Sequence, residues 1–116
     1  MALLTSTETI EHRLTPVADP TSPEHEHWYH RPGIATQVLV IEMMPVLPSG
    51  ESYVGWLRHA DGSWQRAGRF SLDAYGYGRL ILTGSDGVGV QQVVVTRQDT
   101  ETSGPAGAVV LRWTAQ

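Results

Sequence analysis

The sequence predicts an all-β fold: a two-sheet antiparallel β-sandwich of seven or eight strands, with Greek-key, immunoglobulin-like connections. Two observations carry this prediction. Twelve glycines and seven prolines interrupt the 116 residues at short intervals, and the segments between them are short and rich in β-branched or aromatic residues. Apolar residues at helical spacing are almost absent. Because this length is typical of one domain, we expect a single domain over residues 1–116.

Three strands are expected before residue 44. The segment Thr7–Leu14 alternates polar and apolar residues, which is typical of a strand with one buried face. The segment Thr15–Pro23 contains three prolines and is expected to form an irregular loop. A short strand follows near His27–Arg31. The segment Ala35–Met43 has apolar residues at both odd and even positions, so both faces of a strand would be apolar. This predicts a central strand covered on both faces.

The next two expected strands, Ser52–His59 and Ser63–Leu72, form a hairpin. The dipeptide Asp61-Gly62 between them suits a tight turn with positive φ. Trp56 lies in the middle of the first of these strands and is expected to fill the core.

The last three expected strands are Gly78–Thr83, Gln91–Asp99 and Ala108–Thr114. The last two alternate cleanly between two faces, with valines throughout both segments. From all these patterns we expect a core whose main members are Val40, Ile41, Trp56, Phe70, Leu82, Val94 and Leu111, followed by Val38, Leu39, Leu80, Val93 and Val95.

Composition argues against several classes of partner. Eight basic and 12 acidic residues give a net charge of −4, which disfavours binding to nucleic acid through phosphate contacts. No apolar stretch is long enough to span a bilayer, so we expect no direct membrane insertion by this chain. Cysteine and lysine are both absent, which excludes thiolate chemistry, Schiff-base chemistry and a P-loop.

The densest group of potential metal ligands is the run from Glu24 to His30. On a strand, alternation places His25 and His27 on one face, with Glu26 and His30 on the other. Two histidines with a carboxylate can hold Zn²⁺ or Cu²⁺, so these three histidines, with Glu24 or Glu26, form a candidate metal set. The alternative is a mobile edge strand that lacks supporting groups for its ligands. We favour that alternative and predict weak binding at best.

Three of the four tryptophans form a possible ligand face. Trp28 and Trp113 lie near strand ends, and Trp64 follows the expected tight turn. Exposed aromatic rings could bind a sugar or a peptide, although small β-domains also use tryptophan to fill their cores.

Catalytic signals are weak. The segment Thr83–Gly89 is rich in glycine, but turn formation explains it better than phosphate binding, because no lysine or helix follows. A nucleophile elbow is also absent from the sequence. We predict that the chain is not an enzyme, has no catalytic residues and needs no cofactor.

Five motifs occur in the order found in the C-terminal domain of anti-sigma-K factors. Residues 44–57, MPVLPSGESYVGWL, resemble that family's LPPLPxGxxYxxWL stretch. DG at 61–62, AGRF at 67–70 and the later Asp73 with Gly76 or Gly78 resemble its DG…xGxF…DxxG continuation. VVVTR at 93–97 and PAGAVVL at 105–111 resemble its xVTxE…PxGxVVL ending. The resemblance spans residues 38–113. One departure is Arg97, where the family usually has an acidic residue.

The resemblance implies a non-catalytic extracytoplasmic β-sandwich. It would belong to a membrane-anchored anti-sigma regulator, or be a soluble fragment or relative of one. Such a domain acts through a protein partner, through self-association, or as a folded plug that controls proteolysis of its parent. Sigma binding is not carried over, because the family's sigma-binding residues are not among these 116. The alternative function is a carbohydrate- or peptide-binding module that uses the tryptophans.

Overall fold

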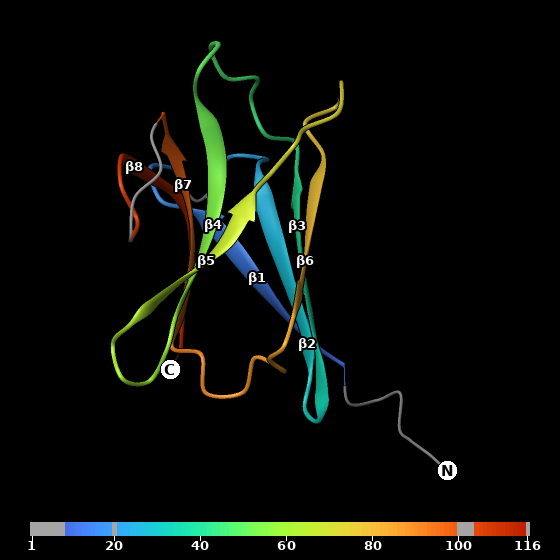
Figure 1. Cartoon of the computed structure of the whole chain (residues 1–116). Helices are drawn as coiled ribbons and strands as arrows, with labels where there is room; N and C mark the ends of the chain where they lie inside the picture. The colour runs from blue at the N-terminus through green and yellow to red at the C-terminus, as the bar shows by residue number, and fades with distance from the viewer. Residues whose placement is uncertain (1–8, 20, 100–103, 116) are drawn as a thin grey trace.

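The chain forms eight β-strands in a computed structural model that describes residues 9–19, 21–99 and 104–115 (Figure 1). No helix occurs among these residues, which confirms the all-β prediction. Likewise, no described segment forms a helix long and apolar enough to cross a membrane. The strands are β1 (Ile10–Pro16), β2 (His25–Arg31), β3 (Ile34–Glu42), β4 (Ser52–Arg58), β5 (Trp64–Arg69), β6 (Gly78–Thr83), β7 (Gln92–Gln98) and β8 (Ala108–Thr114).

The strands form one continuous sheet in the order β5-β4-β7-β8-β1-β2-β3-β6, in which every pair is antiparallel. The strands therefore do not form the two separate sheets of the predicted sandwich. The sheet curls so far that its two edge strands, β5 and β6, come into contact without pairing. This gives a nearly closed, barrel-like shape (Figure 1).

Strand β1 joins the two halves of the sheet. Its residues Ile10 to Leu14 pair with β2, whereas Thr15 and Pro16 pair with β8. The predicted loop Thr15–Pro23 therefore begins two residues too early. Pro16 is tolerated at the end of this strand because a proline there removes only one donor from a short ladder. Thr7, where the first strand was expected to begin, lies outside the described residues.

The hairpin β4–β5 follows the prediction. Gly62 has φ +88°, and its amide donates to the carbonyl of His59 at 2.9 Å. Between Gly55 and Trp56 the register with β5 shifts by one residue, because Ala67 bulges out of the ladder. Gly68, at φ +144°, accommodates this bulge.

The main core lies inside the curled sheet and contains residues from both halves. Its buried members are Leu14, Trp28, Leu39, Ile41, Met44, Tyr53, Leu57, Phe70, Leu82, Val90, Val93, Val95 and Leu111. Most of the predicted core is thus confirmed. However, Val38, Val40 and Leu80 are only half-buried. Strand β3 is fully covered on one face alone, so the expectation of a strand buried on both faces is wrong.

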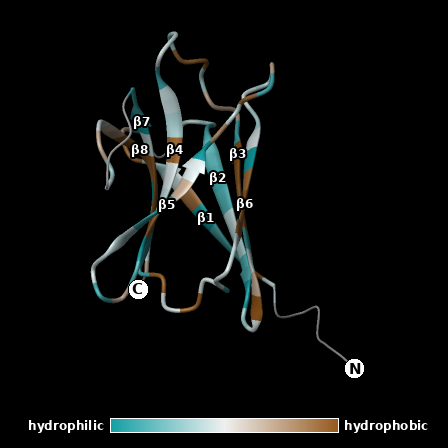
Figure 2. Cartoon of the chain, in the orientation of Figure 1, coloured by the Kyte–Doolittle hydropathy of each residue, from teal (hydrophilic) through white to brown (hydrophobic). Residues whose placement is uncertain are grey.

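A second apolar cluster lies on the outer face of β4 and β7. Val54, Trp56 and Val94 are buried there, with Trp64 and Val109 packed against them. The Trp56 indole donates to Thr96 Oγ1 at 3.0 Å. Trp56 and Val94 are buried as predicted, but in this outer cluster rather than in the main core. Elsewhere Figure 2 shows hydrophobic residues in the loop between β3 and β4, where Met43 and Val46 are exposed.

Candidate functional site

The two faces of β2 carry different chemistry. Its burial alternates strictly, so His25, His27 and Tyr29 lie half-buried on the outer face of the sheet. Glu26, Trp28 and His30 point into the molecule and are buried. This separation follows directly from the two-residue period of a strand whose inner face meets the core.

The outer histidine site consists of His25, His27 and Glu42. His25 Nε2 lies 2.7 Å from Glu42 Oε2, and His27 Nε2 lies 3.2 Å from the same oxygen. One ligand atom from each residue can be chosen so that all three lie within 4.8 Å of one another. The pairing of His25 with Glu42 across β2 and β3 positions the carboxylate beside both rings.

The second ring nitrogen of each outer histidine also faces an oxygen. His25 Nδ1 lies 2.8 Å from the carbonyl oxygen of Pro23, at the end of the preceding loop. His27 Nδ1 lies 2.5 Å from Glu11 Oε2 on the neighbouring strand β1. The Glu11 contact is short but lacks hydrogen-bond alignment, so the two atoms are in close polar contact without a hydrogen bond.

His30 does not belong to this site. Its side chain lies on the opposite face of β2, where His30 Nε2 is 3.1 Å from His12 Nε2. The two rings stack on each other and on Trp28, with ring centroids of His30 and Trp28 4.4 Å apart. The candidate set of three histidines is therefore not brought together, because a strand cannot present residues 25, 27 and 30 on one face.

The carboxylates expected to complete the metal set are also in other places. Glu26 is fully buried, and neither of its oxygens has a hydrogen-bond partner. Glu24 accepts a hydrogen bond from the hydroxyl of Ser22. Glu42, which the sequence analysis did not single out, supplies the carboxylate instead.

Burial controls the titration of the inner groups. It raises the pKa of Glu26 well above the ordinary carboxyl value. Burial also lowers the pKa of His12, helped by the nearby His30. For His30, burial lowers the pKa, and the hydrogen bond with the Asp86 backbone and the Asp86 charge oppose this only in part. All three groups therefore favour their neutral forms in the folded protein.

The three tryptophans do not form one ligand face. Trp28 is 1% exposed, and its indole donates to Gln37 Oε1 at 2.9 Å inside the core. Trp113 packs against it, with ring centroids 5.0 Å apart. Trp64 is half-buried against the outer cluster, with the Arg58 guanidinium 5.9 Å above its ring. The possible ligand face is therefore not assembled, and the other interpretation, that tryptophan fills the core, describes Trp28.

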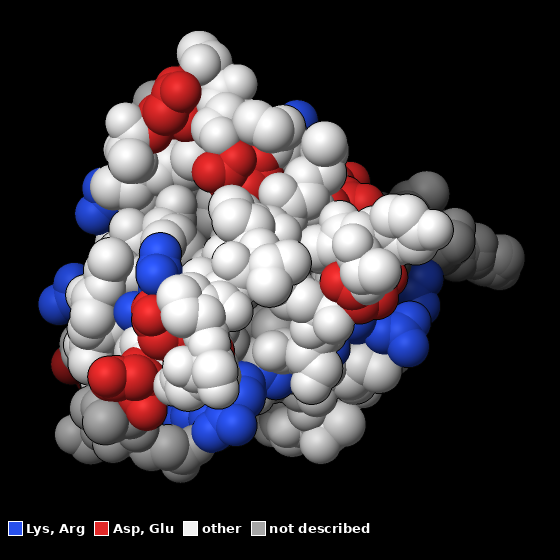
Figure 3. Space-filling view, turned by 90° about the horizontal axis from the view of Figure 1, so that it is seen from above, with Lys and Arg blue, Asp and Glu red and all other residues white. Residues whose placement is uncertain are grey.

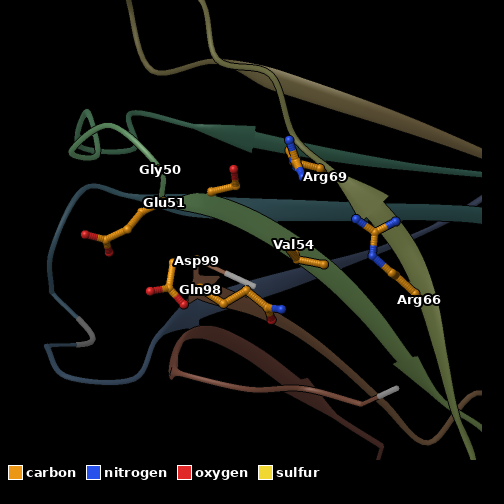
Figure 4. Close-up of a pocket in the computed structure, with 8 residues that line it drawn as sticks. Gly50, Glu51, Val54, Arg66, Arg69, Gln98 and Asp99 are labelled. Carbon is orange, nitrogen blue, oxygen red and sulfur yellow. The ribbon is translucent and has the colours of Figure 1, made fainter. Parts of the chain in front are cut away.

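A polar pocket of about 200 Å³ opens beside the outer cluster, near the ends of β4 and β7 (Figure 4). Arg66 and Arg69 on β5 line one side, and Gln98 and Asp99 at the end of β7 line another. Glu51, on its rim, forms an ion pair with Arg97 at 2.6 Å. No sequence motif marked this pocket, because its residues come from three strands that are separate in the sequence.

Charge does not single out a partner surface at the end of the molecule shown in Figure 3. Acidic and basic side chains are intermixed across that face, and neither sign covers it. Comparison of the chain with protein-family models, with curated proteins and with solved structures finds no match.

Proposed function

We propose that this chain is a non-catalytic, extracytoplasmic binding domain of a membrane-associated regulator, similar to the C-terminal domain of anti-sigma-K factors. The observation that carries this proposal is the structural role of the shared motif residues. The Tyr53 hydroxyl donates to the carbonyl of Pro45 at 2.8 Å, which fastens the Pro-rich connection to the start of β4. The motif thus builds the framework of a β-domain, as expected for a family signature that encodes a fold.

The following motif residues have similar roles. A Cβ placed on Gly55 would lie 3.2 Å from the Phe70 ring, so the glycine lets that ring pack closely against β4. Gly68 lies at the bulge opposite Gly55, and the space above it is filled by Leu80. These contacts connect β4, β5 and β6, the segment over which the motifs are densest.

The departure at Arg97 has a local explanation. The acidic residue usual at this position is replaced by arginine, and Glu51 within the preceding motif supplies the opposite charge at 2.6 Å. An ion pair therefore connects the two motif segments in this chain. Burial of the pair is slight, so we expect it to orient the loop before β4 rather than to stabilise the fold strongly.

We also propose that the connections between the strands are those of a Greek key. Three strands in sequence, β4, β5 and β6, are followed by β7, which lies beside β4. If the contact between β5 and β6 is counted as adjacency, the order is that of a Greek key, in which the fourth strand returns to the first. This connectivity is common in immunoglobulin-like domains.

The action proposed for the domain is contact with a protein partner or with another copy of itself. The alternative is a carbohydrate- or peptide-binding module. The three tryptophans proposed as its binding face do not lie together on the surface. One surface that such a module could still use is the polar pocket beside Arg66 and Arg69. Tryptophan fluorescence measured against a panel of glycans and peptides separates the two functions: a saturable shift favours the module, and no shift favours the regulator.

Membrane topology of the gene product tests the extracytoplasmic assignment. Alkaline phosphatase, which is active only outside the cytoplasm, is fused after Ala115 in the native reading frame, and β-galactosidase is fused at the same point as the control. The proposal predicts active phosphatase and inactive galactosidase. The reverse pattern would contradict it. Upstream coding for a membrane span and a helical domain, beside a sigma-factor gene, would support the regulator further.

A further inference from the structure

We propose that His25, His27 and Glu42 form a binding site for a divalent transition-metal ion of the Zn²⁺ class, with Glu11 and the Pro23 carbonyl as supporting groups. This inference goes beyond the regulator function and does not depend on it. It rests on the number of protons that an imidazole ring carries, on the type and spacing of the ligands, and on the position of the site within the sheet.

A neutral imidazole carries one N–H, so one ring nitrogen donates and the other has a lone pair. Both ring nitrogens of His25 lie within hydrogen-bond distance of oxygens that accept, Pro23 O and Glu42 Oε2. A neutral His25 ring would therefore direct one lone pair at an oxygen. A cation held by the Nε2 atoms of His25 and His27 and by the Glu42 carboxylate removes this conflict, and His25 Nδ1–H then donates to Pro23 O.

Two imidazoles and one carboxylate are a ligand set used for Zn²⁺ in proteins, with metal–ligand bonds of about 2.0–2.2 Å. Such bonds place neighbouring ligand atoms about 3.3 Å apart in a tetrahedron. His27 Nε2 and Glu42 Oε2 are already 3.2 Å apart, and the three-atom group lies within 4.8 Å. His25 Nε2 lies 2.7 Å from the same oxygen, so an ion between them requires these two atoms to separate by about 0.6 Å.

Histidines that bind metals commonly present the other ring nitrogen to a carboxylate or a backbone carbonyl, which fixes the ring and its tautomer. Here the Pro23 carbonyl has this role for His25. The Glu11 carboxylate lies beside His27 Nδ1 at 2.5 Å, but without hydrogen-bond alignment. Weak binding was predicted from the sequence because a mobile edge strand was expected. Instead β2 lies between β1 and β3 and pairs with both.

The site spans three adjacent strands, with Glu11 on β1, the two histidines on β2 and Glu42 on β3. A bound ion would connect the start of β2 to the end of β3. Three protein ligands leave a coordination position for water or for a group from another molecule. Among divalent ions, imidazole and carboxylate ligands do not exclude Cu²⁺ or Ni²⁺, so the proposal concerns this class, with Zn²⁺ as the probe.

Isothermal titration of the full chain with Zn²⁺ at neutral pH, after treatment with a chelator, tests the proposal. We expect one site per chain with sub-micromolar affinity and release of protons on binding. The variants His25→Ala and His27→Ala should each weaken binding by at least a hundredfold. Glu11→Gln should weaken it about 10–100-fold. Cobalt substitution should give the intense visible absorption of a four-coordinate ion.

His59→Ala is the matched control, because His59 contacts Gln65 and lies outside the outer histidine site. Circular dichroism verifies that every variant is folded, which is expected for the two β2 variants because His25 and His27 are only half-buried on the outer face of the sheet. Wild-type affinity weaker than about one micromolar would overturn the proposal. Equal weakening by His59→Ala and by His25→Ala would also overturn it.

Discussion

Glu26 is a carboxyl group buried in an apolar interior, with neither oxygen hydrogen-bonded. Its neighbours across the ladder are Leu14 on β1 and Ile41 on β3, both fully buried. An ionised carboxylate in such a position costs far more free energy than a neutral one. The group therefore stays protonated over a wide pH range in the folded chain, consistent with its raised pKa.

This burial predicts a stability that falls as pH rises. Above pH 4.5 the unfolded chain loses the Glu26 proton while the folded chain keeps it. The free energy of unfolding then falls by about 1.4 kcal/mol per pH unit until the folded group ionises. We expect Glu26→Gln to match the wild type near pH 4.5 and to exceed it increasingly at higher pH. Urea titrations at pH 4.5 and 7.5, both with chelator, measure the difference.

The inner histidines, whose pKa values are lowered, oppose this trend by favouring the folded state at higher pH. They are present in both proteins, so the difference between variant and wild type isolates Glu26. A difference that is the same at both pH values would show that Glu26 is not buried in the way the structure describes.

Trp56 is the largest side chain of the outer cluster and is 1% exposed. We expect Trp56→Ala to lower the free energy of unfolding by about 3–5 kcal/mol, because it removes a buried ring and leaves a cavity. The hydroxyl of Thr96 also loses the indole that donates to it. Urea denaturation measures the loss, and Trp64→Ala, at the half-buried edge of the same cluster, should cost clearly less. Near-wild-type stability of Trp56→Ala would contradict the burial of Trp56 in the outer cluster.

At the level of elements, alternation and turn residues predicted the strands well, because each strand has its own local pattern. Gly78–Thr83 and Ala108–Thr114 agree at both ends. The partner of His25 could not be predicted in this way. A regular hairpin continued from Arg31 and Ile34 would place Val40 opposite His25, but a bulge at His30/Arg31 shifts the register by two residues and brings Glu42 there. Sequence alone does not reveal that bulge.

The loops at one end of the sheet are joined through Gly76. Its carbonyl accepts from the amide of Met44 at 3.1 Å, and a Cβ at Gly76 would lie 2.4 Å from Met44 O. We expect Gly76→Ala to destabilise the chain more than Gly89→Ala. Both glycines have positive φ, a left-handed conformation that costs alanine about 1–2 kcal/mol. Only Gly76 adds a backbone clash, since nothing lies within 4 Å of a Cβ at Gly89.

Chemical denaturation of the two variants gives this comparison directly, provided that the slope of unfolding against denaturant stays unchanged. Equal midpoints for Gly76→Ala and Gly89→Ala would mean that the two loops are not in contact at Gly76.

For the molecule as a whole, the class of fold followed from composition, whereas the continuity of the sheet did not. Continuity depends on β1, which pairs with β2 through five residues and with β8 through two. Nothing in the local pattern of Ile10–Pro16 distinguishes a strand that joins two halves from one that ends in a loop. The burial of the tryptophans could not be predicted for a related reason. Whether Trp28 or Trp64 packs in a core depends on how strands distant in the sequence curl around it.

Far-UV circular dichroism tests the class of fold. The structure predicts a β-rich spectrum with helix content far below one-fifth, since ordinary globular proteins average about one-third helix. Helix above about one-fifth would contradict an all-β domain.

The central proposal drawn from the side-chain geometry is a binding site for a divalent metal ion on the outer face of β2 and β3. Crystals grown with Zn²⁺ and measured on both sides of the zinc absorption edge test it most directly. The account predicts one strong anomalous peak per chain, about 2.0–2.1 Å from the Nε2 atoms of His25 and His27 and within bonding distance of a Glu42 oxygen. A map with no peak at these three residues, or with zinc only at His59 or at lattice contacts, would contradict it.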